Sequence, residues 1–157
     1  MHALSWTPDL ATGFAAIDAD HQEIIGLANS LARDPAGHEA MGGTLAILKY
    51  MEAHVAKHFF AEEELMARYG YPHMFEHMAE HGRIVEYVTN LCREVRNDNA
   101  DVHTLSVSNR LLCNWMVSHI TNHDLKLAEF LRPVAREDAA VSVAAHGSRQ
   151  RSSKRGR

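Results

Sequence analysis

Residues 39–70 read "EAMGGTLAILKYMEAHVAKHFFAEEELMARYG", and their apolar side chains recur every three or four positions. This spacing places them on one face of an α-helix. The face comprises Leu45, Leu48, Met51, Val55, Phe59, Leu65 and Met66. Gly70, directly before Tyr71-Pro72, is a typical helix end. The stretch therefore predicts one long helix.

Three further segments have the same periodicity. We expect a helix over about 19–33, capped by Asp18 or Asp20 and stopped by Asp34-Pro35. A second runs from His73 to the Asn/Asp cluster at 97–99, and a third spans 102–131 and is stopped by Pro133. Four helices with short connections and no strand-like alternation predict an all-α fold, an antiparallel up-down-up-down four-helix bundle with an N-terminal arm. Residues 1–133 would form this domain, and 134–157 a short helix and a basic, disordered tail.

Composition narrows the class of protein. A chain of 157 residues is long enough for one domain with one core. We find no basic flank followed by an apolar run and no long apolar stretch, so we expect a cytoplasmic protein without a membrane span. Cys92 and Cys113 stand apart and are expected as buried free thiols. Five of the 16 lysines and arginines lie in the last eleven residues, but nothing else is typical of a nucleic-acid module.

The chain has twelve histidines, and every predicted helix offers histidines or carboxylates close to its apolar stripe. Pairs four residues apart, such as His58 with Glu62 and His77 with His81, stack on one helix face. The candidates are His21; His54, His58, Glu62 and Glu63; His77 and His81; His119, His123 and Asp124. Inward faces of a bundle converge on one axis, where facing side chains can share metal ions. Nitrogen and oxygen ligands without thiolate favour non-haem iron over structural zinc.

Two bridging carboxylates, five imidazoles and a bridging oxo or hydroxo group would leave one place open on a pair of six-coordinate irons. An open place suits a small diatomic ligand. Two alternatives are enzymes. A carboxylate-bridged diiron oxidase or peroxidase would use Glu-x-x-His pairs, which this sequence lacks. A zinc peptidase is suggested by "HMAEH" at 77–81, but it leaves the histidines of the other helices unexplained.

Four strings resemble the bacteriohemerythrins of the hemerythrin family over about residues 4–131. They are "IDADHQEIIGLAN", "HVAKHFFAEEELM", "YGYPHMFEHMAEH" and "WMVSHITNHD". The resemblance implies a diiron centre in which His77, His81 and His119 bind one iron and His21 and His58 the other, with Glu62 and Asp124 bridging. It also implies reversible O2 binding at the iron held by His21 and His58. We accordingly expect an oxygen carrier, storage or sensing protein and no enzyme, with O2 as ligand, NO as a second possible ligand, a possible protein acceptor of O2 and a monomeric state.

The spacing of His119 and Asp124 conflicts with a regular helix. Positions five apart lie about 140° apart around an α-helix, so regular geometry would favour His123 as the partner of His119. The resemblance favours Asp124. We therefore predict loosened, π-type winding over 119–124.

The remaining polar candidates receive simpler predictions. His54 and His73 are expected on the helix surface rather than supporting a ligand, and Glu63 and Glu64 on a solvated face. Glu80 is expected to turn away from His81. Trp115 is expected to pack in the core and could also wall the O2 site, with Phe59 and Ile120 nearby. His2, His38, His103 and His146 are expected to be exposed.

Overall fold

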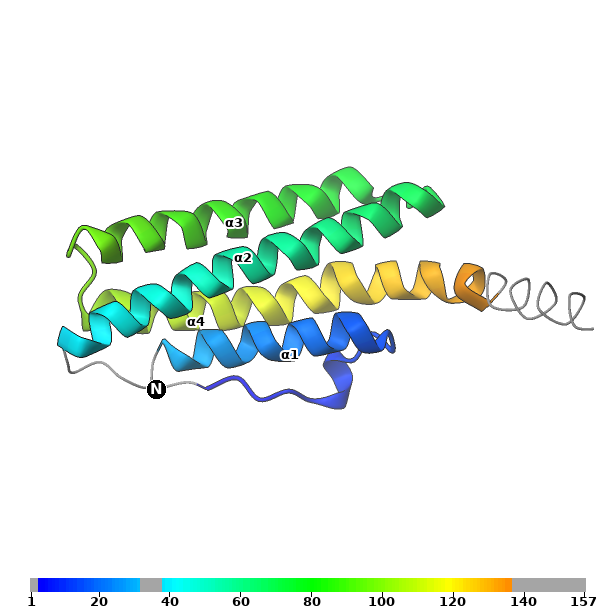
Figure 1. Ribbon diagram of the computed structural model, residues 1–157. Helices are drawn as coiled ribbons and strands as arrows, with labels where there is room; N and C mark the ends of the chain where they lie inside the picture. The colour runs from blue at the N-terminus through cyan, green and yellow to red at the C-terminus, as the bar shows by residue number, and fades with distance from the viewer. Residues whose placement is uncertain (1–2, 32–37, 137–157) are drawn as a thin grey trace, which may run out of the picture.

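The structure is a computed structural model, and it describes residues 3–31 and 38–136, with the side chains of 38–42 left aside. Helices α1 (Ala15–Ser30), α2 (His38–Tyr69), α3 (Met74–Arg96) and α4 (Val102–His119) run alternately up and down along one bundle (Figure 1). A π-helical turn, Ile120–Asp124, follows α4, and 125–136 continue as α-helix. A short 3-10 turn, Pro8–Leu10, precedes α1. The predicted all-α, antiparallel bundle is confirmed.

The helices pack around two apolar clusters, a large one and a smaller one that contains Met66, Tyr71, Leu127 and Leu131. Helix α2 packs against α3 and α1, and α1 packs against α4. The N-terminal arm runs beside α1 (Figure 1), where the Asn29 side chain accepts from the backbone N–H of Leu4 and donates to its carbonyl. At the neighbouring residue of α1, the buried Asn109 of α4 donates to the carbonyl of Ala28 at 2.7 Å. Such bonds satisfy polar groups that burial would otherwise leave unpaired.

The α2–α3 turn follows directly from local sequence. Gly70 has φ +67°, a left-handed conformation in which glycine avoids a Cβ clash. The N–H of Tyr71 then donates to the carbonyl of Met66 at 2.9 Å, and both side chains lie in one apolar cluster. This is a Schellman motif, and it ends α2 one residue before the predicted glycine. Because the turn is so tight, α3 begins at Met74 beside the end of α2.

Two predicted helix ends are wrong. Helix α1 begins at Ala15, not near 19, because the Asp18 carboxylate reaches back to the N–H groups of Thr12 and Gly13 and to the Thr12 hydroxyl. Neither Asp18 nor Asp20 is the N-cap, which is Phe14. The last helix continues to 136 through Pro133. Leu131 and Val134, on either side of this proline, pack into the cluster with Met66 and Tyr71, so tertiary contacts override the local preference.

Several predictions fall outside the described residues. These are the Asp34-Pro35 stop, the helix and tail beyond 136, and the exposure of His2, His38 and His146. The domain boundary at 133 stays a prediction. His103 is exposed and Cys92 and Cys113 are buried free cysteines, as predicted. Among the described helices, none is both long and apolar enough to cross a membrane.

Candidate metal centre

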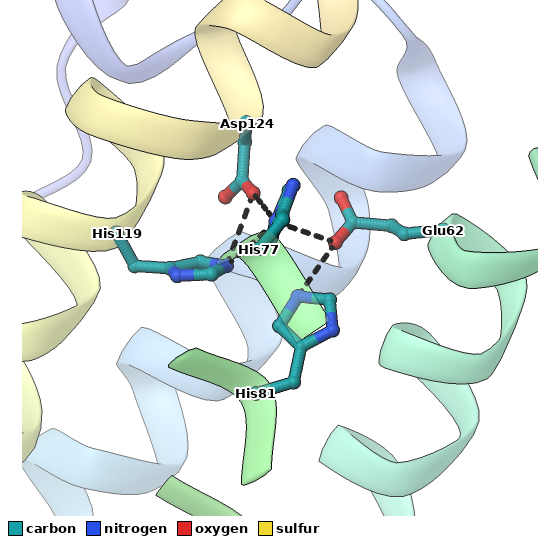
Figure 2. A group of neighbouring side chains, drawn as sticks. All are labelled: Glu62, His77, His81, His119 and Asp124. Atoms are coloured by element: carbon teal, nitrogen blue, oxygen red, sulfur yellow. Dashed lines mark hydrogen bonds and ion pairs between the residues drawn. The ribbon is translucent and has the colours of Figure 1, made fainter. Parts of the chain in front are cut away.

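The structure brings all seven predicted ligand residues together inside the bundle, and each is buried. They are His21 on α1, His58 and Glu62 on α2, His77 and His81 on α3, His119 at the end of α4, and Asp124 in the π-turn that follows. Five of them point toward one another in Figure 2, from three helices. The fold produces this convergence, because the seven positions are spread over more than a hundred residues of sequence.

One group of possible ligands combines the two carboxylates, Glu62 and Asp124, with histidines of α3 and α4. Glu62, His77, His81, His119 and Asp124 each offer one ligand atom, and these atoms lie within 4.8 Å of one another. The Asp124 Oδ1 atom lies 3.0 Å from Nε2 of His77 and 3.1 Å from Nε2 of His119. The Oε2 atom of Glu62 lies 3.3 Å from Nε2 of His81 (Figure 2). Three imidazoles thus face two carboxylates.

A second group lies toward α1 and shares a member with the first. It consists of His21, His58 and Glu62, again with ligand atoms within 4.8 Å. Asp124 also reaches this side, because its Oδ2 atom lies 3.2 Å from Nε2 of His21. Each carboxylate therefore faces imidazoles of both groups, which is the arrangement of a bridging ligand between two neighbouring ions.

The π-turn explains how Asp124 joins His119. The N–H of Leu125 donates to the carbonyl of Ile120, five residues earlier, so residues five apart stack along this segment. The hydroxyl of Thr121 also donates to the carbonyl of Val117, a side-chain bond that tends to bend helices. The predicted loosened winding is confirmed. His123 lies outside both candidate groups, with its ring 5.3 Å from that of His119.

Two carboxylates that sequence reasoning missed contact the outer nitrogens of the histidines. Nδ1 of His81 lies 2.9 Å from Oε1 of Glu63, so the solvated face predicted for Glu63 is wrong. Nδ1 of His58 lies 3.4 Å from Oδ2 of Asp20. A carboxylate at the outer nitrogen fixes the orientation of an imidazole whose other nitrogen faces a metal. The sequence around Glu63 could not predict this contact, because its partner His81 lies on another helix.

Other single-residue predictions can also be compared with the structure. His54 is largely buried and lies 3.4 Å from Asp20, so its predicted surface position is wrong. His73 and Glu64 are exposed, as expected. Glu80 pairs with Arg83 and belongs to neither group, so the glutamate of "HMAEH" takes no part in the cluster.

Aromatic rings cover two of the histidines. The Phe59 ring stacks on His81 with centroids 3.9 Å apart, and Trp115 stacks on His119 at 4.4 Å. Ile120 is fully buried beside them. Trp115 packs against the core, as predicted. These side chains make the α3 and α4 side of the cluster apolar.

Burial also sets the ionisation of the cluster. It lowers the pKa of His58 to about 4 and that of His81 to about 2, and neighbouring imidazoles add to the effect. For Asp124, burial alone would raise the pKa, but the imidazoles of His119, His21 and His77 hold it well below its usual range. Burial and the nearby Asp124 raise the pKa of Glu62. Neutral imidazoles beside an ionised carboxylate are the forms that bind metal ions.

The cluster fits a cation because its polar atoms lack partners. Both oxygens of Glu62 and of Asp124, and the Nε2 atoms of His21, His58 and His81, are buried without a hydrogen bond in the described structure. An unpaired buried polar atom costs a few kcal/mol. So many in one place are unfavourable unless something positively charged lies among them. Nitrogen and oxygen donors without sulfur fit iron better than a structural zinc site.

The comparisons with known proteins agree with this chemistry. Residues 12–131 match the sequence model of the family described as "Hemerythrin HHE cation binding domain". The chain is 31% identical over 147 residues to a bacteriohemerythrin of Ralstonia nicotianae, covering 90% of this chain and 100% of that protein. It is 30% identical over 135 residues to one of Stenotrophomonas maltophilia, covering 82% of each. The crystal structure of a wild-type hemerythrin superposes with a TM-score of 0.74 at 25% identity, covering 83% of this chain and 98% of that one.

Proposed function

The chain belongs to the hemerythrin family, and from this premise we propose that its buried cluster holds two non-haem irons that bind O2 reversibly. The observation that carries the proposal is the pair of candidate groups that share Glu62. Like the bacteriohemerythrins it resembles, the chain is a cation-binding protein and not an enzyme. The number of irons and the identity of the gas are the proposed part.

The proposed ligands divide unequally. His77, His81 and His119 would hold one iron, and His21 and His58 the other, with Glu62 and Asp124 between them. The distances from Asp124 to His21 on one side and to His77 and His119 on the other support a bridging role. One iron would thus receive three imidazoles and its neighbour two, so a place for a small ligand would lie on the side of His21 and His58.

A ferrous pair, when bound, supplies this place and the two electrons that reversible O2 binding needs. The protein orients the ligand rings and keeps water away from them. Asp20 orients the His58 ring, and Glu63 the His81 ring, through contacts with their Nδ1 atoms. Phe59, Ile120 and Trp115 present apolar surface beside His81 and His119, and the Phe59 ring also lies 5.4 Å from that of His58, so apolar contacts reach both groups and disfavour the entry of water and protons. Such a lining favours release of the bound gas unchanged over its further reduction.

Several cellular roles could use the same site. Storage, delivery to a protein acceptor and sensing all remain compatible with this site, and NO as a second ligand, the monomeric state and the cytoplasmic location stay predictions. The two groups together contain five histidines and two carboxylates. This histidine-rich set is the reason to prefer a carrier over the oxidase or peroxidase alternative.

The test is anaerobic reconstitution of the metal-free protein with ferrous iron, followed by cycles of O2 and argon. We expect about two irons per chain and a visible absorption band that appears with O2 and disappears under argon. Glu64→Gln changes an exposed carboxylate on α2, the helix that carries Glu62, and serves as the control variant. Steady O2 consumption with an added reductant, or an irreversible spectral change in the first cycle, would overturn the carrier and favour the oxidase.

A further inference from the structure

A third group of possible metal ligands lies at the rim of the bundle, next to the buried centre. It consists of Asp20 and Glu23 on α1 and His54 on α2, with one ligand atom of each within 4.8 Å of the others. Nε2 of His54 lies 3.4 Å from Oδ1 of Asp20, and Nδ1 lies 3.8 Å from Oε2 of Glu23. Asp20 and Glu23 are one turn apart and share a face of α1.

The histidine of this group has one buried ring nitrogen without a hydrogen bond. The His54 side chain is 10% exposed. Its Nε2 atom is fully buried and makes no hydrogen bond, although it lies close to the Asp20 carboxylate. A buried imidazole nitrogen that faces a carboxylate without bonding to it is unfavourable by itself. A cation between the two groups would satisfy both.

The second carboxylate is held in place by a neighbour that is not acidic. The hydroxyl of Tyr50 donates to Oε1 of Glu23 at 2.7 Å, which leaves Oε2 as the oxygen that faces His54. The Tyr50 ring also stacks on the His54 ring, with centroids 6.0 Å apart. Tyr50 thus contacts both Glu23 and His54.

Asp20 connects this rim group to the buried centre. Its Oδ1 atom faces His54, while its Oδ2 atom lies 3.4 Å from Nδ1 of His58. Exposure of the side chains falls steadily along the series, from 44% for Glu23 and 33% for Asp20 to 10% for His54 and 2% for His58. The polar groups thus lead from solvent to a proposed iron ligand.

We propose that Asp20, Glu23 and His54 form a separate site for a divalent cation, which receives ferrous iron from solvent and passes it to His21 and His58. Two carboxylate oxygens and one imidazole nitrogen suit Fe²⁺ or Mn²⁺. Three protein ligands at a partly open rim should bind a cation more weakly than the buried place that would receive it, which has His21 and His58 with the shared carboxylates Glu62 and Asp124. The transfer step rests on the proposed diiron function, whereas the rim site itself does not.

The first experiment follows iron uptake in time. Metal-free protein is mixed anaerobically with ferrous iron, and samples are quenched with a chelator that removes iron not yet in the centre. We expect His54→Gln and Glu23→Gln to load about tenfold more slowly or worse, because each removes one of three ligands, while the final iron content and the O2 spectrum stay unchanged. The matched control is His73→Gln, an exposed histidine that lies 3.9 Å from Glu76 on α3. Equal loading rates in all four proteins would overturn the transfer step.

The second experiment detects the site at equilibrium. Iron-loaded protein is titrated with Mn²⁺, and free Mn²⁺ is measured by its electron paramagnetic resonance signal. We expect one additional Mn²⁺ per chain in the wild type and in His73→Gln, and at least tenfold weaker binding in His54→Gln and Glu23→Gln. Equal Mn²⁺ binding in all proteins would overturn the rim site. If reconstitution leaves no iron in the protein, the titration is made on that protein, and one Mn²⁺ per chain that His54→Gln loses would uphold the rim site and overturn the diiron function with its transfer step.

Discussion

Replacing Glu62 by glutamine should stabilise the metal-free protein while abolishing tight iron binding. Glu62 is buried, and neither of its oxygens has a hydrogen-bond partner. Its pKa is raised above the usual 4.5 by burial and by Asp124, so ionising it inside the fold is unfavourable. Glutamine has nearly the same shape and no charge, and its amide can donate to the Nε2 atom of His81, which lies 3.3 Å from Oε2 of Glu62.

The size and sign of the effect follow from proton linkage. Above pH 4.5 the carboxyl group is ionised in the unfolded chain but is held protonated in the folded one, so this one group lowers the stability of the wild type relative to Glu62→Gln by about 1.4 kcal/mol for each pH unit of rise. The fall stops where Glu62 ionises in the fold. Glu62→Gln does not titrate, so its advantage should be near zero at pH 4 and about 1–3 kcal/mol at pH 7. For a chain of this size that corresponds to a melting point higher by roughly 2–10 °C.

The assay is urea or thermal unfolding of metal-free protein from pH 4 to 7, alongside iron content after reconstitution. Glu64→Gln makes the same charge change at an exposed position of the same helix and should alter neither quantity by much. We expect Glu62→Gln to lose at least a hundredfold in iron affinity, more than removal of an outer partner would cost. The reasoning is refuted if metal-free Glu62→Gln is no more stable than wild type at pH 7, or if it retains two irons.

Three further outcomes are expected. Glu63→Gln should weaken iron binding about tenfold by removing the charged partner of His81 Nδ1, which competition with a chelator would measure; an unchanged affinity would contradict that role. Wild-type metal-free protein should lose stability as pH falls below 6.5, because the lowered pKa values of His58 and His81 keep these rings neutral in the fold while the unfolded chain takes up protons. The slope is up to about 1.4 kcal/mol per pH unit for each ring, and a flat profile of urea midpoints between pH 6.5 and 5 would argue against it. Phe59→Ala should cost about 3–5 kcal/mol of stability by opening a cavity against His81. It should also speed irreversible oxidation of the oxygenated iron protein, measured as loss of its visible band. Wild-type values for both quantities would exclude a protective lining.

Local sequence signals sufficed for elements whose cause is local. The long apolar stripe and Gly70 placed α2 correctly, because helical periodicity and a left-handed glycine act within a few residues. The same reasoning failed at Asp18 and Pro133. Asp18 bonds a loop that precedes α1, and contacts with α2 and its following turn support the helix on both sides of Pro133. The Asp18 contact depends on how the chain turns at Thr12 and Gly13, and the contacts around Pro133 join segments far apart in sequence.

The candidate site divides in the same way. Pairs such as His58 with Glu62 and His77 with His81 are visible in sequence because a helix stacks positions four apart. The partnership of His119 with Asp124 is not, because it requires the π-turn, and only the resemblance to the family pointed to it. The contacts of Asp20, Glu63 and His54 were missed because each is made to another helix.

The sequence by itself therefore determined that the chain forms four amphipathic helices and that their apolar sides carry histidines and carboxylates. Tertiary structure decided which of these side chains meet, since that depends on how each helix is rotated and shifted against its neighbours. A rotation of one residue, about 100°, would exchange a buried ligand for an exposed one. Glu62 and Glu64 lie two positions apart, and only packing makes one the shared centre of two ligand groups and leaves the other in solvent.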